Sequence, residues 1–295
     1  MVKLADISKT QTMTNFIVPI DFSPDSLKGL EWAILFSRKK TVNIQMVYVL
    51  TNSSNFQSRV VEQEHQYADT QFKKLIKERG PALGNQSKLR YIIKKGKVYR
   101  EVVNQVNSYK NAVVSASTHG ASGFEELFVG SNALKIVAAI DQPVFTIRTN
   151  VPQEVNRIVV PIKMHSDTRQ KAPAAADLAE LFGAELHVIS ISTRNNARDL
   201  NRLESYSKQV INYFKARELK TFAKTLVGDS LPTLTCNYAE TVGADLITIM
   251  SSALDKWNVL LGSFAQQMVN SSPVPLLHIT PNEKQIAAGF SNFGG

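Results

Sequence analysis

A stretch of small and polar residues from Ser117 to Asn132 carries residue types that could bind a phosphate. The members with that chemistry are Ser117, Thr118, His119, Gly120, Gly123, Gly130, Ser131 and Asn132. Glycines let the backbone approach a ligand closely, and the free N–H groups and dipole at the start of a helix favour negative charge. The stretch has neither the Gly-Lys-Ser/Thr of a Walker loop nor the GxGxxG dinucleotide fingerprint. It predicts a phosphate-binding loop of another kind.

Three residues in or near this loop have more than one interpretation. His119 could act as a base near neutral pH. No Ser or Asp partner at a telling spacing accompanies it, so we expect it to pack at a strand end or to touch the ligand. Asp21 has three interpretations: a metal ligand, a turn and cap residue before the first helix, or a residue that contacts the ligand of the loop. Ser131 donates to a phosphate, caps a helix, or does both. The other histidines lack the spacing of metal ligands, so we expect neither a metal site nor a catalytic residue.

The sequence around the loop predicts the elements that would position it. Apolar runs predict strands at 15–20, 43–50, 89–93, 112–116 and 143–147, and helical spacing predicts helices at 24–35, 57–79, 98–109 and 133–140. Ser23 and Pro24 form a helix start, and the buried side of the long helix is expected to include Tyr67, Ala68 and Phe72. Strands separated by helices predict an α/β fold with a parallel sheet covered on both faces.

The second half of the chain repeats this order. Arg157 to Ile162 matches the first strand, Gly228 matches Gly96, and Gly262-Ser263 matches Gly130-Ser131. A duplicated domain explains the repeat. We therefore predict two tandem domains, residues 1–150 and 151–295, with a frayed tail from about residue 283.

Composition narrows the class of protein. The chain has 295 residues, a formal net charge of +9 and one cysteine, Cys236. The basic residues are scattered and have no aromatic interleaving, so we expect no nucleic-acid partner. The first fourteen residues lack the apolar core of a signal peptide, and no run approaches the length of a membrane span. These features predict a cytoplasmic protein that neither contains disulfides nor binds membranes.

Several marks in order make the chain resemble a tandem universal stress protein. They are Val18 to Asp21, Thr118-His119-Gly120, the nine residues before Gly130-Ser131, and a closing Pro143-Val144 strand, with counterparts in the second half. The resemblance extends from about residue 15 to residue 280. It implies two Rossmann-like domains of the HUP type, each a five-stranded parallel sheet with helices on both faces.

The resemblance also implies a nucleotide site in the first domain. Nucleotide-binding members of the family carry Gly, two residues, Gly, nine residues, then Gly-Ser or Gly-Thr. Here Gly120 and Gly130-Ser131 stand as in the family, whereas Ser117 replaces the first glycine. By resemblance, the ribose and phosphates would be held by Gly120, Gly123, Gly130, Ser131 and Asn132, beside Ser117 and His119, and adenine would be flanked by Pro19, Ile20, Asp21 and Val49.

The second copy departs further from the pattern. Lys163 matches Asp21, and Ser252-Ala253-Leu254 matches Thr118-His119-Gly120. Without these glycines, side chains would stand where phosphates pass. We predict that the second domain binds no nucleotide or binds it poorly.

Three functions are compatible with the sequence. The first is a stress-response or regulatory protein whose N-terminal domain binds ATP, with Mg²⁺, or AMP or ADP, and signals to a regulatory protein. The second is a slow ATPase or phosphoryl-transfer enzyme, although no Lys or Arg lies between Thr118 and Asn132 to neutralise phosphate charge. The third is a ligand-free dimerisation scaffold. By resemblance, the domains pair through their last strands, Val144 to Ile147 and Val274 to Ile279, within one chain as a pseudo-dimer or between chains as a homodimer.

Overall fold

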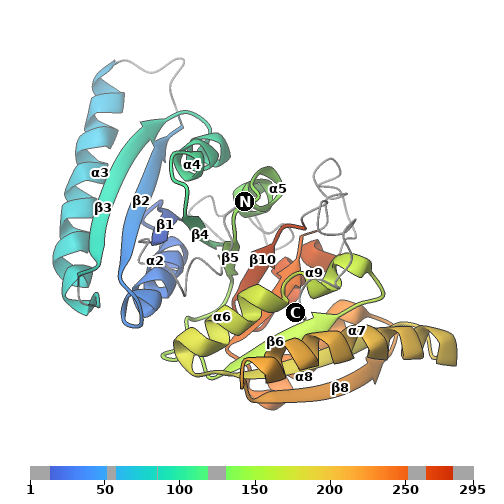
Figure 1. Cartoon of the computed structure of the whole chain (residues 1–295). Helices are drawn as coiled ribbons and strands as arrows, with labels where there is room; N and C mark the ends of the chain where they lie inside the picture. Colours follow the sequence, from blue (N-terminus) through green and yellow to red (C-terminus); the bar gives the residue numbers. More distant parts are fainter. Residues whose placement is uncertain (1–13, 52–57, 85, 119–130, 252–263, 282–295) are drawn as a thin grey trace. The chain divides into compact units, whose positions relative to one another are not determined.

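The computed structural model describes residues 14–51, 58–84, 86–118, 131–251 and 264–281 (Figure 1). Within these ranges the chain divides into two compact units, with the division between Val151 and Pro152. Each unit is an α/β domain, as the sequence predicts. No helix among the described residues is both long and apolar enough to cross a membrane.

The first unit is a five-stranded parallel sheet with strand order β3-β2-β1-β4-β5. Its strands are β1 (Thr14–Pro19), β2 (Val42–Leu50), β3 (Lys88–Lys95), β4 (Ala112–Ser117) and β5 (Val144–Ile147). Its helices are α2 (Pro24–Ser37), α3 (Ser58–Arg79), the 3₁₀ helix η1 (Gly80–Ala82), α4 (Val98–Asn107) and α5 (Ser131–Ala139). All of these elements except η1, which was not predicted, lie within a few residues of the ranges expected from the sequence.

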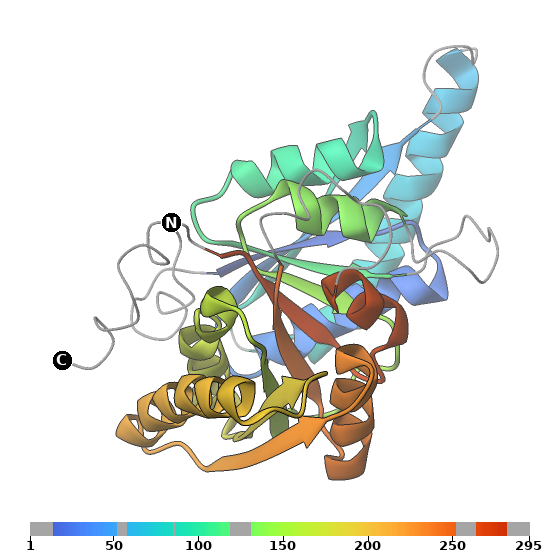
Figure 2. The ribbon, with the colours of Figure 1, turned by 90° about the vertical axis from the view of Figure 1, so that its right-hand side faces the viewer.

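Alternating side chains along β1 enter two different cores. The ring of Phe16 packs against Phe36 of α2, with ring centroids 5.1 Å apart. Its neighbour Ile17 belongs to an aliphatic cluster with Val102 of α4 and Ile136 of α5. Figure 2 shows α4 and α5 lying together. Helices therefore cover both faces of the sheet, which explains why its strands are apolar throughout.

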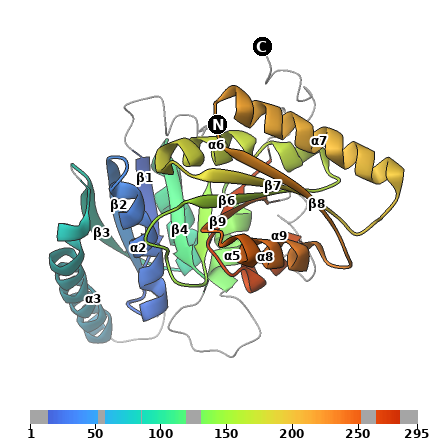
Figure 3. The same cartoon turned by 90° about the horizontal axis from the view of Figure 1, so that it is seen from below.

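The second unit repeats the fold with strand order β10-β9-β6-β7-β8. Its strands are β6 (Arg157–Ile162), β7 (Glu185–Ser192), β8 (Thr221–Val227), β9 (Leu246–Met250) and β10 (Leu276–Ile279). Its helices are the 3₁₀ helix η2 (Ser166–Arg169), α6 (Ala172–Phe182), α7 (Ala197–Ala216), α8 (Leu231–Val242) and α9 (Phe264–Ser271). Strands β6, β7 and β8 lie side by side in Figure 3, with α7 alongside. The duplicated order of elements is confirmed.

Two expectations about individual side chains need correction. Tyr67 of α3 is 55% exposed, whereas Ala68 and Phe72 are fully buried as expected. Tyr67 lies at the margin of the buried stripe, where its ring meets only the edge of Phe22, with centroids 6.0 Å apart. The sequence repeat matches residues 245–250 with the strand at 112–116, but β9 begins at Leu246. The Asp245 carboxylate instead accepts hydrogen bonds from the backbone N–H groups of Asn156 and Arg157 at 2.7 and 2.9 Å.

Candidate functional site

The predicted site lies outside the carboxyl ends of β1 and β4, where the strand order reverses. The ladder between β1 and β4 ends at Ile17 and Val114, whereas β4 stays paired with β5 as far as Ser117 and Ile147. The end of β1 instead follows β2, since the N–H of Ile20 donates to the carbonyl of Val47 at 2.9 Å. The two strand ends therefore part, and this is where open α/β sheets bind their ligands.

We call the region beyond these parted strand ends the first crevice, and Asp21 occupies an ordered turn beside it. Its carboxylate accepts from the N–H of Ser23 at 3.0 Å and from the Ser23 hydroxyl at 2.6 Å. Its own N–H donates to the hydroxyl of Ser26 at 3.3 Å. Ser23 caps α2 by accepting from the N–H of Ser26 at 3.1 Å. The turn and cap role of Asp21 is thus present, and its carboxylate remains exposed to solvent.

Phe22 anchors this turn, a role that the sequence reasoning missed. Its backbone is left-handed, with φ of 64°, which costs a residue with a side chain about 1 kcal/mol. Its ring stacks on Tyr48 with centroids 5.2 Å apart and meets the ring of Phe72 edge-on at 4.9 Å. Such aromatic pairs contribute about 0.5–1.5 kcal/mol each. The packing therefore offsets the strain and fixes the position of Asp21.

A hydrogen bond ties the same aromatic group to α3. The hydroxyl of Tyr48 donates to Glu64 at 3.0 Å. Burial, followed by the neighbouring Glu64 carboxylate, raises the pKa of Tyr48 to about 12. Tyr48 consequently stays protonated and keeps donating over the whole physiological pH range.

The structure brings the other described site residues to the same edge of the sheet. Pro19 ends β1, Ser117 ends β4, and Val49 near the end of β2 joins the aliphatic cluster that includes Ala116 of β4. Ser131 begins α5, and Asn132 is exposed in its first turn. The remaining predicted site residues, His119, Gly120, Gly123 and Gly130, lie outside the described residues.

The equivalent crevice of the second unit repeats one hydrogen bond of this turn and carries a different charge. The N–H of Lys163 donates to the hydroxyl of Thr168 at 3.0 Å, as the N–H of Asp21 does to Ser26. The ammonium group of Lys163 lies 4.4 Å from the centre of the Phe264 ring, at the start of α9. Lys163 therefore occupies the position of Asp21, as the sequence comparison predicts.

Hydrogen bonds correct the match of the two loops by one residue. The N–H of Thr118 donates to the carbonyl of Ile147 at 3.0 Å, and the N–H of Ser251 donates to Ile279 at 2.9 Å. Thr118 is thus equivalent to Ser251 rather than to Ser252. Sequence comparison alone could not place this boundary, because both residues are serines in a stretch without glycine.

A buried lysine lies beside the second crevice. Lys171 is 1% exposed, and its ammonium nitrogen donates to the carbonyl of Thr168 at 2.7 Å and to its hydroxyl at 3.2 Å. Burial, reinforced by the nearby charge of Lys163, lowers the pKa of Lys171 to about 7. Lys171 lies eight residues after Lys163, and the residue eight after Asp21 in the first unit is Gly29, inside α2. A Cβ on Gly29 would lie 2.7 Å from the carbonyl oxygen of Ser115, so no side chain fits there.

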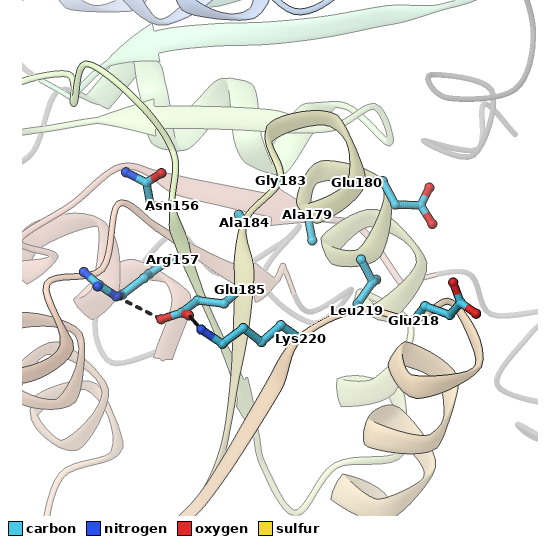
Figure 4. Close-up of a pocket in the computed structure, with 10 residues that line it drawn as sticks. All are labelled: Asn156, Arg157, Ala179, Glu180, Gly183, Ala184, Glu185, Glu218, Leu219 and Lys220. Carbon is cyan, nitrogen blue, oxygen red and sulfur yellow. Dashed lines mark hydrogen bonds and ion pairs between the residues drawn. The ribbon is translucent and has the colours of Figure 1, made fainter.

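An open cleft of about 440 Å³ lies at the opposite, amino-terminal end of the second sheet (Figure 4). Glu185 at its centre pairs with Arg157 at 3.0 Å and with Lys220 at 2.7 Å. Hydrogen bonds from Lys220, then from His187 and Arg157, lower the pKa of Glu185 to about 2. Its carboxylate is therefore held in ion pairs and is a poor candidate for an acid or base.

The remaining candidates from the sequence are structural where they are described. His187 packs on Phe222, with ring centroids 4.9 Å apart, and hydrogen-bonds the Tyr238 hydroxyl at 3.0 Å. Cys236 and His278 are buried. Among the described residues, no three His, Cys, Asp or Glu side chains come together as a metal site would require.

Comparison with known proteins identifies this arrangement of elements. The model of the universal stress protein family matches residues 13–148 and 154–279. A universal stress protein from Archaeoglobus fulgidus has a similar structure, with a TM-score of 0.73 and 18% identity over 92% of this chain and 97% of its own. A putative universal stress protein from Pseudomonas aeruginosa has a TM-score of 0.66 and 15% identity, over 97% of this chain and 99% of its own. No curated protein sequence matches the chain.

Proposed function

The chain belongs to the universal stress protein family, and from this premise we propose that its first domain binds an adenine nucleotide and that the protein regulates a stress response. ATP, with or without Mg²⁺, is the first ligand to test, followed by ADP and AMP. The observation that carries the proposal is the parting of β1 and β4 beside the ordered turn of Asp21. This is the place where a ligand can lie between two strand ends.

The residues at this crevice suit the parts of a nucleotide. Pro19, which is half-buried at the end of β1, offers apolar surface to adenine, and the buried Ile20 and Val49 lie beside it at the ends of β1 and β2. The exposed carboxylate of Asp21 can accept from ribose hydroxyls or the adenine amino group. The start of α5 at Ser131 favours phosphate. Ser117 adds a side chain where the family has glycine, so we expect weaker binding than in members that keep it.

The second domain acts in this proposal as a structural partner. Lys163 and Lys171 replace Asp21 and Gly29 at its crevice, so the carboxylate that would contact the nucleoside is missing and a lysine takes its place. The last strands of the two domains, β5 and β10, would pair within one chain as a pseudo-dimer. A nucleotide that binds one conformation better than another would then change the affinity for a regulatory protein.

Calorimetry with ATP, ADP and AMP tests the site assignment. We expect one nucleotide per chain and at least about a tenfold loss of affinity in Gly130→Val, because an isopropyl group blocks close approach of the backbone. Gly262→Val makes the same change in the second domain and should bind as wild type does. Two nucleotides per chain, or equal binding by wild type and Gly130→Val, would refute the assignment.

Phosphate release distinguishes binding from catalysis. The proposal expects no Mg²⁺-dependent release of phosphate from ATP above the level in Gly130→Val. Release that wild type shows and Gly130→Val lacks would make the protein a slow ATPase instead.

A further inference from the structure

Among the residues that the structure describes, strand β8 forms an open edge of the second sheet. It pairs with β7 on one side and ends the strand order of its unit (Figures 1 and 3). Five of its seven residues are exposed, and Phe222 and Val227 keep 43% and 40% of their surface in contact with solvent. An edge strand of this kind presents unpaired backbone groups that can add another strand.

The register of the sheet identifies which backbone groups point outward. The N–H of Leu186 donates to the carbonyl of Lys220, and the N–H of Gly228 donates to Ser192. In a parallel ladder, alternate residues point toward the same neighbour. Even-numbered residues of β8 therefore bond to β7, and Thr221, Ala223, Thr225 and Val227 direct their N–H and C=O groups away from the sheet.

The equivalent edge strand of the first unit, β3, is protected. Gly96 and Gly228 align the two strands, since each glycine N–H donates to the last residue of the neighbouring strand. β3 carries basic residues at Lys88, Arg90, Lys94 and Lys95, which discourage pairing between edges. Tyr91 of β3 reaches α3 through a 2.6 Å hydrogen bond to Asp69.

These protective residues are missing from β8. Ala223 takes the place of Tyr91, and Phe222, Leu226 and Val227 take the places of Arg90, Lys94 and Lys95. Lys224 is the one charged residue within β8. The second copy of the domain has thus exchanged a charged, covered edge for an apolar, open one.

The charge pattern suits a second copy of the chain as occupant and excludes an axis at Lys224. Two identical strands related by a two-fold axis run antiparallel. An axis at Lys224 would place its charge opposite itself, which is unfavourable. An axis at Ala223 places Phe222 opposite Lys224 of the second copy and Thr221 opposite Thr225. This register gives two cation–π contacts and two Thr–Thr pairs, and it uses the outward backbone groups of Thr221, Ala223 and Thr225.

We propose that β8 is an interface through which two copies of this chain pair antiparallel about Ala223. A contact limited to one strand is small, so its dissociation constant is expected to be on the order of 10 µM. This interface is separate from pairing through β5 and β10, and it does not depend on nucleotide binding.

Sedimentation velocity of the full chain, from micromolar to hundreds of micromolar, tests the interface. Wild type should shift toward the mass of two chains as concentration rises. Ala223→Lys and Ala223→Glu each place like charges on the axis and should weaken association at least about tenfold. An equimolar mixture of the two variants should restore it, because opposite charges then meet. Ser205→Lys and Ser205→Glu change the exposed Ser205 of α7 in the same way and should associate as wild type does.

The outcomes are decisive in both directions. A wild type of one chain mass at every concentration would overturn the proposal. The proposal would also be overturned if Ala223→Lys and Ser205→Lys associated with the same dissociation constant. Failure of the mixture to restore association would rule out the register about Ala223. Equal thermal unfolding of all variants, expected because residue 223 is exposed, ensures that the comparison concerns association.

Discussion

At the scale of single residues, burial strongly changes the acid–base chemistry of Lys171. Its folded-state pKa is about 7 and its ordinary value is 10.5, so between these pH values the unfolded chain binds more protons than the folded chain. Stability contributed by this site therefore rises with pH across that window and is constant below it. The cost of burying the ammonium group is greatest at and below pH 7.

Replacing this lysine isolates its effect. We expect the stability of Lys171→Met relative to wild type to be greatest near pH 7 and to fall steadily as pH is raised toward 10, because methionine keeps the packing and removes the charge. Urea unfolding at several pH values measures this difference. Lys208→Met, which changes a 70% exposed side chain, should show no such trend. If the stability difference between Lys171→Met and wild type did not change with pH, the pKa of Lys171 would not be lowered in the folded protein.

At the scale of elements, Arg217 at the end of α7 holds α6 in place. Its guanidinium contacts the nearly buried carboxylate of Asp177 at 2.7 Å and makes two bonds to Glu180, at 2.7 and 2.6 Å. Both carboxylates belong to α6, and Glu180 also borders the cleft of Figure 4. A paired guanidinium of this geometry joins two helices through directed bonds.

Removing this guanidinium should destabilise the second domain. We expect Arg217→Met to cost about 2–4 kcal/mol, because the carboxylate of Asp177 stays buried after losing its cation. Lys215→Met, at an exposed position on the same helix, should change stability by less than about 0.5 kcal/mol. Chemical unfolding of the two variants beside wild type gives the comparison. If Arg217→Met and Lys215→Met lost similarly small amounts of stability, the contacts of Arg217 with Asp177 and Glu180 would contribute no more than a surface ion pair.

Elements were also the level at which sequence was most informative. Strands buried on both faces are continuous apolar runs, and Ser23 with Pro24 signals a helix start, so the order of elements in both halves followed from local patterns. Packing between distant residues left no such pattern. The left-handed backbone of Phe22 depends on Tyr48 and Phe72, which lie far from it in the sequence. The sequence also did not predict that Tyr67 is exposed, because its position in the helical repeat fits the buried side of α3.

At the scale of the whole molecule, duplication has let the two domains diverge. The first crevice carries an acidic residue, Asp21, and the second carries Lys163, whose N–H makes the equivalent hydrogen bond to a hydroxyl five residues on. The first edge strand is basic and covered, and the second is apolar and open. One copy thus keeps the features that suit a nucleotide, whereas the other gains an edge suited to association. The family resemblance predicted the first difference, and only exposure in the folded chain reveals the second.

This divergence predicts that ATP protects one domain only. A ligand at one hundred times its dissociation constant stabilises its site by about 2.7 kcal/mol. Hydrogen exchange should therefore slow at the amides of Ile20 and Thr118, where β1 and β4 end, and remain unchanged at Ile162 and Ser251, the equivalent positions of β6 and β9. At the same ATP concentration, Gly130→Val should reduce the protection to about 1.4 kcal/mol or less, because its dissociation constant is expected to be at least about tenfold higher. Gly262→Val should keep the full protection. Equal slowing at both crevices would contradict the assignment of the nucleotide to the first domain, because it would require a second site where Lys163 replaces Asp21.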